Sequence, residues 1–340
     1  MERLKNLISS SRFSEQTVIV LFLLVTAGAL FSRARAGEML RLEESAEAMG
    51  STYSIAVYGE DQTVMENAVE SAFDEARRLD GELSNYEPAS EWSQVNRFAA
   101  QRPVQVPPDL FELLSACLRY SRESDGAFDI TVGPLMRVWG FYKGTGHIPK
   151  KSEIEAARQI VGYRNIELVQ AQRTVRFLKK GIEIDPGGIG KGYAVDRMVD
   201  ILRKNGIRIA LVSASGSSIY ALGSPPGEEG WHVDIKNPRD VSKTAEEVVL
   251  KDESMSTSGN YEKFFKADGR VYSHIMDPRT GYPAPGMLSV SVVTPQTIDS
   301  EAWTKPCFIN GRRWAAKHLP SGAKAYFCED KADQSCAWLQ

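Results

Sequence analysis

A glycine-rich stretch in the second half of the chain has the residue types that bind a phosphate group. Residues 185–196 read DPGGIGKGYAVD, in which Gly187, Gly188 and Gly190 precede Lys191. Glycine lets the backbone approach a phosphate closely, the first N–H groups of a following helix attract an anion, and lysine adds a positive charge. The stretch matches neither GxGxxG nor GxxxxGK[ST]. A tight turn that needs glycine only for packing is therefore an equally good interpretation.

Two further segments carry groups suited to the same chemistry. Residues 213–218 (SASGSS) place Ser215, Gly216 and Ser217 after an apolar run. Small hydroxyl residues there can hydrogen-bond a phosphate or a sugar, although they are also common in ordinary loops. His274 lies in a predicted strand before an Asp-Pro turn, where an imidazole can contact a phosphate or transfer a proton. A lone histidine in a strand more often has a structural role, and that alternative stays open.

A fourth segment suggests a pocket for a flat ring system. Residues 125–141 (DGAFDITVGPLMRVWGF) combine glycines and aromatic residues with two carboxylates, Asp125 and Asp129. That composition suits a pocket for a planar heterocycle. The alternative is a core segment with turns.

The rest of the sequence contains helix-like and strand-like patterns of apolar residues, which predict the elements that must position these groups. Residues 51–58 and 181–185 alternate as strands do, and residues 63–80 have apolar side chains at helical spacing. Capping-box signatures at Asp109 and Ser152 predict two further helix starts. Strand-like runs recur at residues 207–212, 231–235, 248–250, 271–275 and 288–293. Many late strands with few helices between them predict an α+β fold, with a mixed or antiparallel sheet, flanking helices and one or two lobes.

Composition narrows the classes of partner. The chain has 340 residues, of which 42% are hydrophobic and 25% are charged, and its net charge is −3. These values are typical of a globular protein, and without a basic run along a helix we expect no nucleic-acid partner. Four cysteines form no CxxC pattern. Cys328 and Cys336 can pair across a short loop in an oxidising compartment or remain free thiols.

The N-terminal residues 1–36 have the order of charges and apolar residues of a secretory signal. Basic residues precede an apolar run at residues 17–31, and Ala34-Arg35-Ala36 follows as a small-x-small site. An uncleaved signal anchor is the alternative, because Arg33 and Arg35 crowd the cleavage site. In both cases we expect residues 37–340 to form one exported domain.

Taken in this order, the segments resemble the ApbE family of FAD:protein FMN transferases. The resemblance covers nearly all of residues 45–330, and its matching pieces are residues 49–52, 84–96, 125–141, 185–196, 213–223, 256–261 and 274–281. It implies an exported enzyme that binds FAD and cuts its diphosphate with the help of Mg²⁺. FMN would pass as a phosphoester to a Thr or Ser of an exported or membrane-bound partner protein, with release of AMP. Some relatives hydrolyse FAD, so an FAD pyrophosphatase is the first alternative.

The resemblance also assigns roles to individual residues. The residues expected to bind the flavin nucleotide are Met49, Gly50, Ser51, Tyr86, Asp125, Ser215, Gly216 and Ser217. The residues expected at the diphosphate are Asp185, Gly187, Gly188, Lys191 and His274. Among these we expect His274 to contact phosphate or move a proton, Lys191 to act through its charge, and Asp185 to lie beside the metal or the base.

The metal site implied by the resemblance departs from the family pattern. It would use a backbone carbonyl, here that of Gly190, and an Asp and a Thr four residues apart, here Glu301 and Lys305. Glu301 can bind Mg²⁺, whereas a protonated lysine has no lone pair to offer. Three interpretations follow: a metal bound without Lys305, Lys305 in place of the metal, or a flavin-nucleotide binder without catalysis. Pro306 is expected to disturb this helix if Ser300 begins it.

Overall fold

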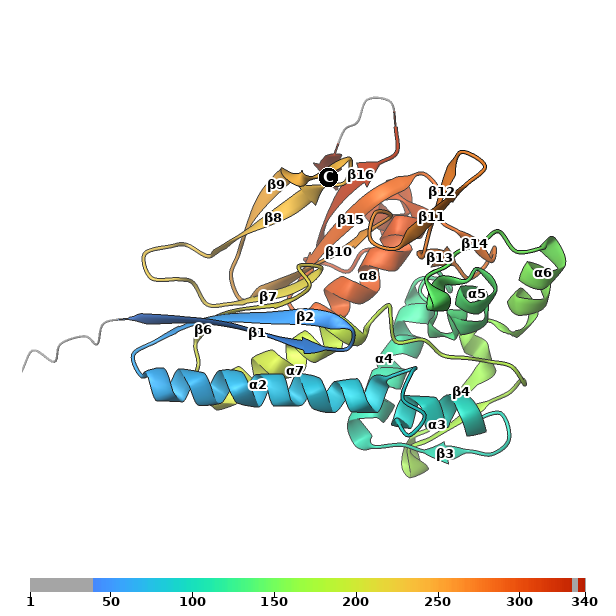
Figure 1. Cartoon of the computed structure of the whole chain (residues 1–340), viewed down its shortest axis with the longest axis horizontal. Coiled ribbons are helices and arrows are strands. Elements are labelled where there is room, and N and C mark those ends of the chain that lie inside the picture. The colour runs from blue at the N-terminus through green and yellow to red at the C-terminus, as the bar shows by residue number, and fades with distance from the viewer. Residues whose placement is uncertain (1–38, 332–335, 340) are drawn as a thin grey trace, which may run out of the picture. The chain divides into compact units, whose positions relative to one another are not determined.

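An antiparallel sheet organises the fold, and it carries the core on both of its faces (Figure 1). The computed structural model describes residues 39–331 and 336–339. Within these ranges eight strands pair in the order β1 (Leu40–Ala48), β2 (Ser51–Gly59), β6 (Ile209–Ala214), β7 (Ser218–Leu222), β10 (Glu253–Gly259), β15 (Met287–Thr294), β16 (Lys324–Glu329) and β17 (Cys336–Trp338). From β2 to β17 the neighbouring strands run antiparallel. The expected α+β class is confirmed.

The chain divides into two units, residues 1–40 and residues 41–340, and the fold described here is that of the second. The expected signal segment, residues 1–36, lies outside the described residues. Within the described ranges, no helix combines the length and the apolarity needed to cross a bilayer.

Two helices, α2 (Gln62–Leu83) and α7 (Gly190–Lys204), pack side by side on one face of the sheet (Figure 1). The buried stripe of α2 recurs every three or four residues, as the sequence predicted for residues 63–80. The side chains in this layer are Met65, Ala68, Ala72, Phe73, Ala194, Met198, Leu202, Tyr53, Ile55 and Val57. This packing fixes the position of α7 and therefore of the glycine-rich turn that leads into its first residue, Gly190.

Helix α8 (Thr297–Asn310) packs on β10 and β15 and contains Pro306 in its interior. The sequence analysis considered Ser300 as the start of this helix. The helix instead starts one turn earlier, at Thr297. The Asp196 carboxylate of α7 accepts hydrogen bonds from the backbone N–H groups of Thr297 and Ile298, at 2.7 and 2.8 Å. It satisfies two donors that a helix start leaves free, so α7 determines where α8 begins.

The opposite face of the sheet is covered by a long hairpin of two strands, β8 (Trp231–Asn237) and β9 (Asp240–Leu250). Trp231, Val233 and Ile235 alternate inward and pack on sheet residues such as Ile219 and Leu288. The predicted strands at 231–235 and 248–250 are confirmed as parts of this hairpin.

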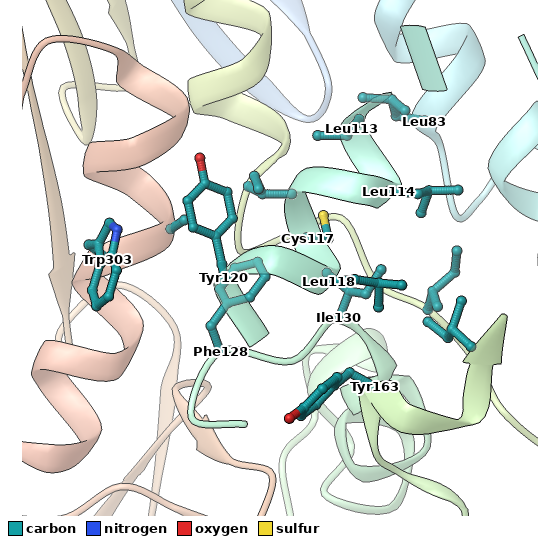
Figure 2. Packing of buried hydrophobic residues seen from close by; sticks show 14 of the residues in the cluster. Leu83, Leu113, Leu114, Cys117, Leu118, Tyr120, Phe128, Ile130, Tyr163 and Trp303 are labelled. Atoms are coloured by element: carbon teal, nitrogen blue, oxygen red, sulfur yellow. The ribbon is translucent and has the colours of Figure 1, made fainter. Parts of the chain in front are cut away.

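A helical region adjoins the end of α2. Its elements are α3 (Glu91–Phe98), α4 (Pro108–Glu123), α5 (Gly133–Val138), α6 (Lys151–Ile160) and a small sheet of β3 (Val104–Gln105), β5 (Thr174–Phe177) and β4 (Ile166–Val169). Figure 2 shows α4 directing Leu113, Leu114 and Cys117 into a core that continues to Trp303 of α8. The Tyr120 hydroxyl donates to Asp299 at 2.5 Å, so a polar contact also joins α4 to α8.

Short elements complete the chain. They are the single-turn helices Ile130–Val132, Phe141–Lys143, Tyr163–Asn165 and Gln170–Gln172, the strands β11 (Phe264–Ala267), β12 (Arg270–Ser273), β13 (Met276–Asp277) and β14 (Tyr282–Pro283), and the helix α9 (Arg312–His318). Cys328 of β16 and Cys336 of β17 form a disulfide, which the sequence had left open. Cys117 and Cys307 are buried free thiols.

Four sequence-based expectations about local structure are wrong. Asp109 does not cap α4, because Pro107 and Pro108 start that helix and the Asp109 carboxylate pairs with Arg78 at 3.0 Å. Ser152 does not cap α6, which begins at residue 151, and it is Glu153 that accepts from the Lys150 N–H at 2.7 Å. Residues 181–185 form no strand, and His274 lies just after β12 instead of within a strand at residues 271–275.

Replacing Leu114 with alanine tests the core between α4 and α8. Leu114 is 1% exposed, so Leu114→Ala should lower the free energy of unfolding by about 2–5 kcal/mol, through lost burial and the cavity left behind. Urea denaturation measures the change. The control Leu178→Ala removes a leucine that is 56% exposed and should change the unfolding free energy little. Equal effects of the two substitutions would contradict the packing.

Candidate functional site

The segment that leads into the glycine-rich turn is held by side chains of α3 and by backbone bonds to residues 130–133. The Asp185 N–H donates to the Ile130 carbonyl at 2.7 Å, and the Gly133 N–H donates to the Glu183 carbonyl at 3.2 Å. The Asn96 side chain of α3 donates to the Ile184 carbonyl at 3.0 Å and accepts from the Ile184 N–H at 2.7 Å. Trp92 Nε1 donates to the same carbonyl at 2.9 Å. The Asn96 side-chain amide thus bonds to both backbone groups of Ile184, as a neighbouring strand would. The position of the next residue, Asp185, is therefore fixed relative to α3.

Asp185 is the most densely bonded of the expected site residues. Its carboxylate accepts from the Tyr142 hydroxyl at 2.5 Å, from the Gly187 N–H at 2.6 Å and from Asn85 Nδ2 at 3.5 Å. Burial raises the pKa of Asp185, whereas the hydrogen bonds from Tyr142 and Gly187 and the charge of Lys263 lower it. These bonds hold the carboxylate at the entrance of the turn.

The turn then leads into α7, whose first residues meet the loop between β1 and β2. Ile189, the residue before α7, provides no side-chain cap. An added Cβ at Gly190 would lie 3.1 Å from Met49 Cε, so the β1–β2 loop packs directly on the helix start. Met49 and Gly50 both have positive φ, 53° and 63°, as the two residues of a tight turn between paired strands often do. The expected residues Met49, Gly50 and Gly190 thus lie together.

Lys191, at the second position of α7, reaches the loop between β6 and β7. Its ammonium donates to Ser217 Oγ at 2.5 Å, and Ser217 Oγ donates in turn to the Ala214 carbonyl at 3.2 Å. Ser215 has a φ of 52° and donates its N–H to the Thr52 carbonyl at 2.8 Å. The glycine turn, the β1–β2 loop and the β6–β7 loop are thereby joined.

Glu301 and Lys305 of α8 lie beside the same helix start. Glu301 is 3% exposed, and its Oε2 accepts a hydrogen bond from the Gly192 N–H. Its Oε1 lies 3.7 Å from Lys305 Nζ, which also donates to the Glu301 carbonyl at 3.1 Å. A Cβ added at Gly188 would lie 3.6 Å from Lys305 Cε, which places the lysine stem against the glycine turn. Burial lowers the pKa of Lys305 to about 8.

His274 carries a ring nitrogen that is left free to accept a proton. Its Nδ1 lies 3.1 Å from the Lys263 carbonyl. Because a carbonyl only accepts, Nδ1 must carry the hydrogen and Nε2 the lone pair. Burial is the main cause that lowers the pKa of His274 to about 4, and the charges of Lys263, Lys305 and Lys191 lower it further. The imidazole is therefore neutral at neutral pH, and the charges of three lysines act on it.

The structure does not bring every expected residue to this cluster. Asp125 is exposed with a φ of 51°, and its charge acts on Arg279. Tyr86 is 78% exposed, although its neighbour Asn85 donates to Asp185. Ser51 lies at the start of β2, next to the Gly50 turn. The assignments of these residues to nucleotide binding stay predictions.

Two contacts of the site were missed in the sequence. Tyr142 follows directly after the aromatic segment 125–141, so extending that segment by one residue would have included it. Lys263 lies eleven residues before His274 and contacts it through a backbone carbonyl. A backbone carbonyl leaves no sequence signal, so only the fold could reveal this bond.

The residues present do not form a complete site for a divalent metal. Within the described ranges, no three His, Cys, Asp or Glu side chains converge as ligands would. Around Glu301 the second side chain is the Lys305 ammonium, which has no lone pair and repels a cation. Asp299, two residues before Glu301, instead accepts from Tyr120. The donor set at α8 therefore does not fit the Mg²⁺ that the resemblance implied.

The fold is that of a known enzyme class. Residues 49–327 match the model of the ApbE family. A Klebsiella pneumoniae (strain 342) protein named FAD:protein FMN transferase is 30% identical over 269 residues, which are 78% of this chain and 81% of that protein. The solved ApbE protein of Thermotoga maritima has a TM-score of 0.81 at 29% identity, covering 88% of this chain and 96% of its own. The apo flavinyl transferase ApbE of Pseudomonas stutzeri has a TM-score of 0.76 at 28% identity, covering 89% and 95%.

The class is thus that of the flavin transferases, enzymes that transfer a group. The chain belongs to the ApbE family.

The environment of His274 predicts a pH dependence of stability. The unfolded chain binds a proton at an ordinary histidine pKa of about 6.5, whereas the folded chain resists it down to about pH 4. Between these values the unfolded state holds more protons, so the free energy of unfolding should fall as the pH is lowered from 6.5 toward 4. Urea denaturation across this range should show a shallower fall for His274→Gln. The control is a substitution at exposed His147, and equal slopes for wild type and His274→Gln would contradict the prediction.

Proposed function

We propose that this ApbE-family transferase binds FAD, breaks its diphosphate and attaches FMN to a Thr or Ser hydroxyl of a partner protein, releasing AMP. The relatives named for this activity support the proposal. The observation that carries it is the meeting of the α7 start with Lys191, Lys305 and Lys263 around a neutral His274. Fixed positive charge and oriented N–H donors are what phosphoryl transfer needs, because the protein does little covalent work.

His274 is the base that the geometry favours. Its Nε2 lone pair can take the proton of the acceptor hydroxyl while the hydroxyl oxygen bonds to the phosphorus on the FMN side. The bond from that phosphorus to the bridging oxygen breaks, and AMP leaves with the electron pair. The lysines stabilise the charge that grows on the leaving phosphate. Asp185 positions the glycine turn through the Gly187 N–H.

The flavin nucleotide would lie along the two loops beside α7. The β1–β2 loop with Met49 and Gly50 and the β6–β7 loop with Gly216 are joined to the helix start by the contacts described above. Tyr86, whose ring is 78% exposed, is one residue from Asn85 and is available to stack on a planar ring. This arrangement supports a pocket open to a protein acceptor.

An FAD pyrophosphatase would use the same groups with water in place of the acceptor hydroxyl. A flavin-nucleotide binder without catalysis is the alternative that Lys305 and Pro306 favour, because Lys305 stands at a ligand position of the implied metal site and Pro306 lies inside the helix that carries it.

We also propose that the protein is exported, to the periplasm or to the outer face of the cytoplasmic membrane. The apolar run at residues 17–31 with basic residues before it supports this location. The Cys328–Cys336 disulfide supports it independently, since disulfides persist mainly in oxidising compartments. The partner would then be another exported or membrane-bound protein.

Incubation of the purified protein with FAD, Mg²⁺ and an exported acceptor protein with an exposed Thr tests the activity. Mass spectrometry should show the acceptor heavier by FMN less one water, together with AMP in the supernatant. His274→Ala should slow the transfer by about 10²–10⁴-fold, because the general base is lost. His147→Ala serves as the control for an exposed histidine.

The arm without acceptor separates the alternatives. Free FMN and AMP formed at the same rate without acceptor would contradict transfer and show hydrolysis. FAD that binds and is recovered intact in both arms would contradict catalysis altogether.

A further inference from the structure

Glu301 already has partners for both of its carboxylate oxygens within the chain. Oε2 accepts from the Gly192 N–H at the third position of α7, and Oε1 faces Lys305 Nζ at 3.7 Å. The Glu301 side chain is almost fully buried, and a buried carboxylate needs a paired charge. Lys305 provides that charge from the next turn of the same helix.

Lys305 also faces the place where the diphosphate would bind. Its stem lies against Gly188, a position that has no side chain of its own to separate the lysine from the turn. Lys305 and Lys191 act on each other and on His274 through their charges, so both ammonium groups lie at one site. With Lys263 they bring three positive charges against two carboxylates, those of Glu301 and Asp185. The remaining positive charge suits an anion.

We propose that the Lys305 ammonium supplies the positive charge that a divalent metal would otherwise supply at the diphosphate, so that FAD binds without metal. The inference rests on the proposed function for its ligand, and it extends to catalysis: FMN transfer would also proceed without metal. A metal ion at the Glu301 carboxylate would have to displace or approach this ammonium, which repels it. The lysine is a permanent part of the chain, whereas a metal must be acquired.

The proposal predicts what happens when the ammonium is removed. Lys305→Thr leaves a carboxylate and a hydroxyl four residues apart on one helix face, both oxygen donors of the kind Mg²⁺ takes. The variant should therefore bind FAD weakly in EDTA and regain affinity when Mg²⁺ is added. Lys305→Arg keeps the charge and should stay independent of metal.

Titration of FAD into the full chain, followed by flavin fluorescence in EDTA and in Mg²⁺, tests the proposal. For wild type the two Kd values should agree within about twofold. For Lys305→Thr the Kd in EDTA should rise about ten- to hundredfold, as expected for one lost charge-assisted bond to phosphate. The matched control is Lys317→Thr, at an exposed lysine of α9, which should behave as wild type.

Wild-type binding that disappears in EDTA and returns with Mg²⁺ would overturn the proposal, and this arm needs no variant to fold. An unchanged Kd for a folded Lys305→Thr in EDTA would overturn it as well, with folding checked by circular dichroism. Equal FAD binding in EDTA and Mg²⁺ without transfer to an acceptor would support the charge inference and contradict the proposed function. Absence of FAD binding in both conditions would overturn both.

Discussion

The contact between Glu301 and the start of α7 holds the site together. A helix start leaves backbone N–H groups without partners, and Ile189 before α7 supplies no cap. The Glu301 carboxylate of α8 accepts from one of these donors, at Gly192, and Asp196 of α7 caps α8 in return. Each helix therefore stabilises the beginning of the other. The glycine turn, Lys191 and Lys305 take their relative positions from this reciprocal bonding.

The charge balance around the start of α7 follows from the contact between Glu301 and Gly192. Glu301 is buried by its bond to α7, and its burial makes a nearby cation favourable. In this chain the cation is an ammonium on the same helix, and its charge adds to those of Lys191 and Lys263 around His274. Burial, aided by these charges, lowers the pKa of His274 and keeps the imidazole neutral. The same arrangement supplies the positive charges and the base on which the proposed function depends.

Sequence patterns predicted the elements better than their boundaries. The apolar spacing of α2 and the alternation of β8 were sufficient, because each element buries one regular face. The start of α8 could not be located from its own sequence, because the carboxylate that caps it, Asp196, comes from another helix. The segment before Asp185 alternates as a strand does, yet its backbone bonds go to the Asn96 side chain and to the backbone of residues 130–133. Local patterns do not record partners that are distant in the sequence.

The sequence alone determined the family, the glycine turn with Lys191 and the presence of lysine at residue 305, and it singled out His274, because each depends on residue type and order. The tertiary structure decided which atoms meet. It placed Tyr142 on Asp185, the Lys263 carbonyl on His274 and the Glu301 carboxylate between α7 and Lys305. These contacts join residues far apart along the chain, and one of them uses a backbone carbonyl. Hydrogen-bond geometry between such groups exists only once the sheet and its helices have packed.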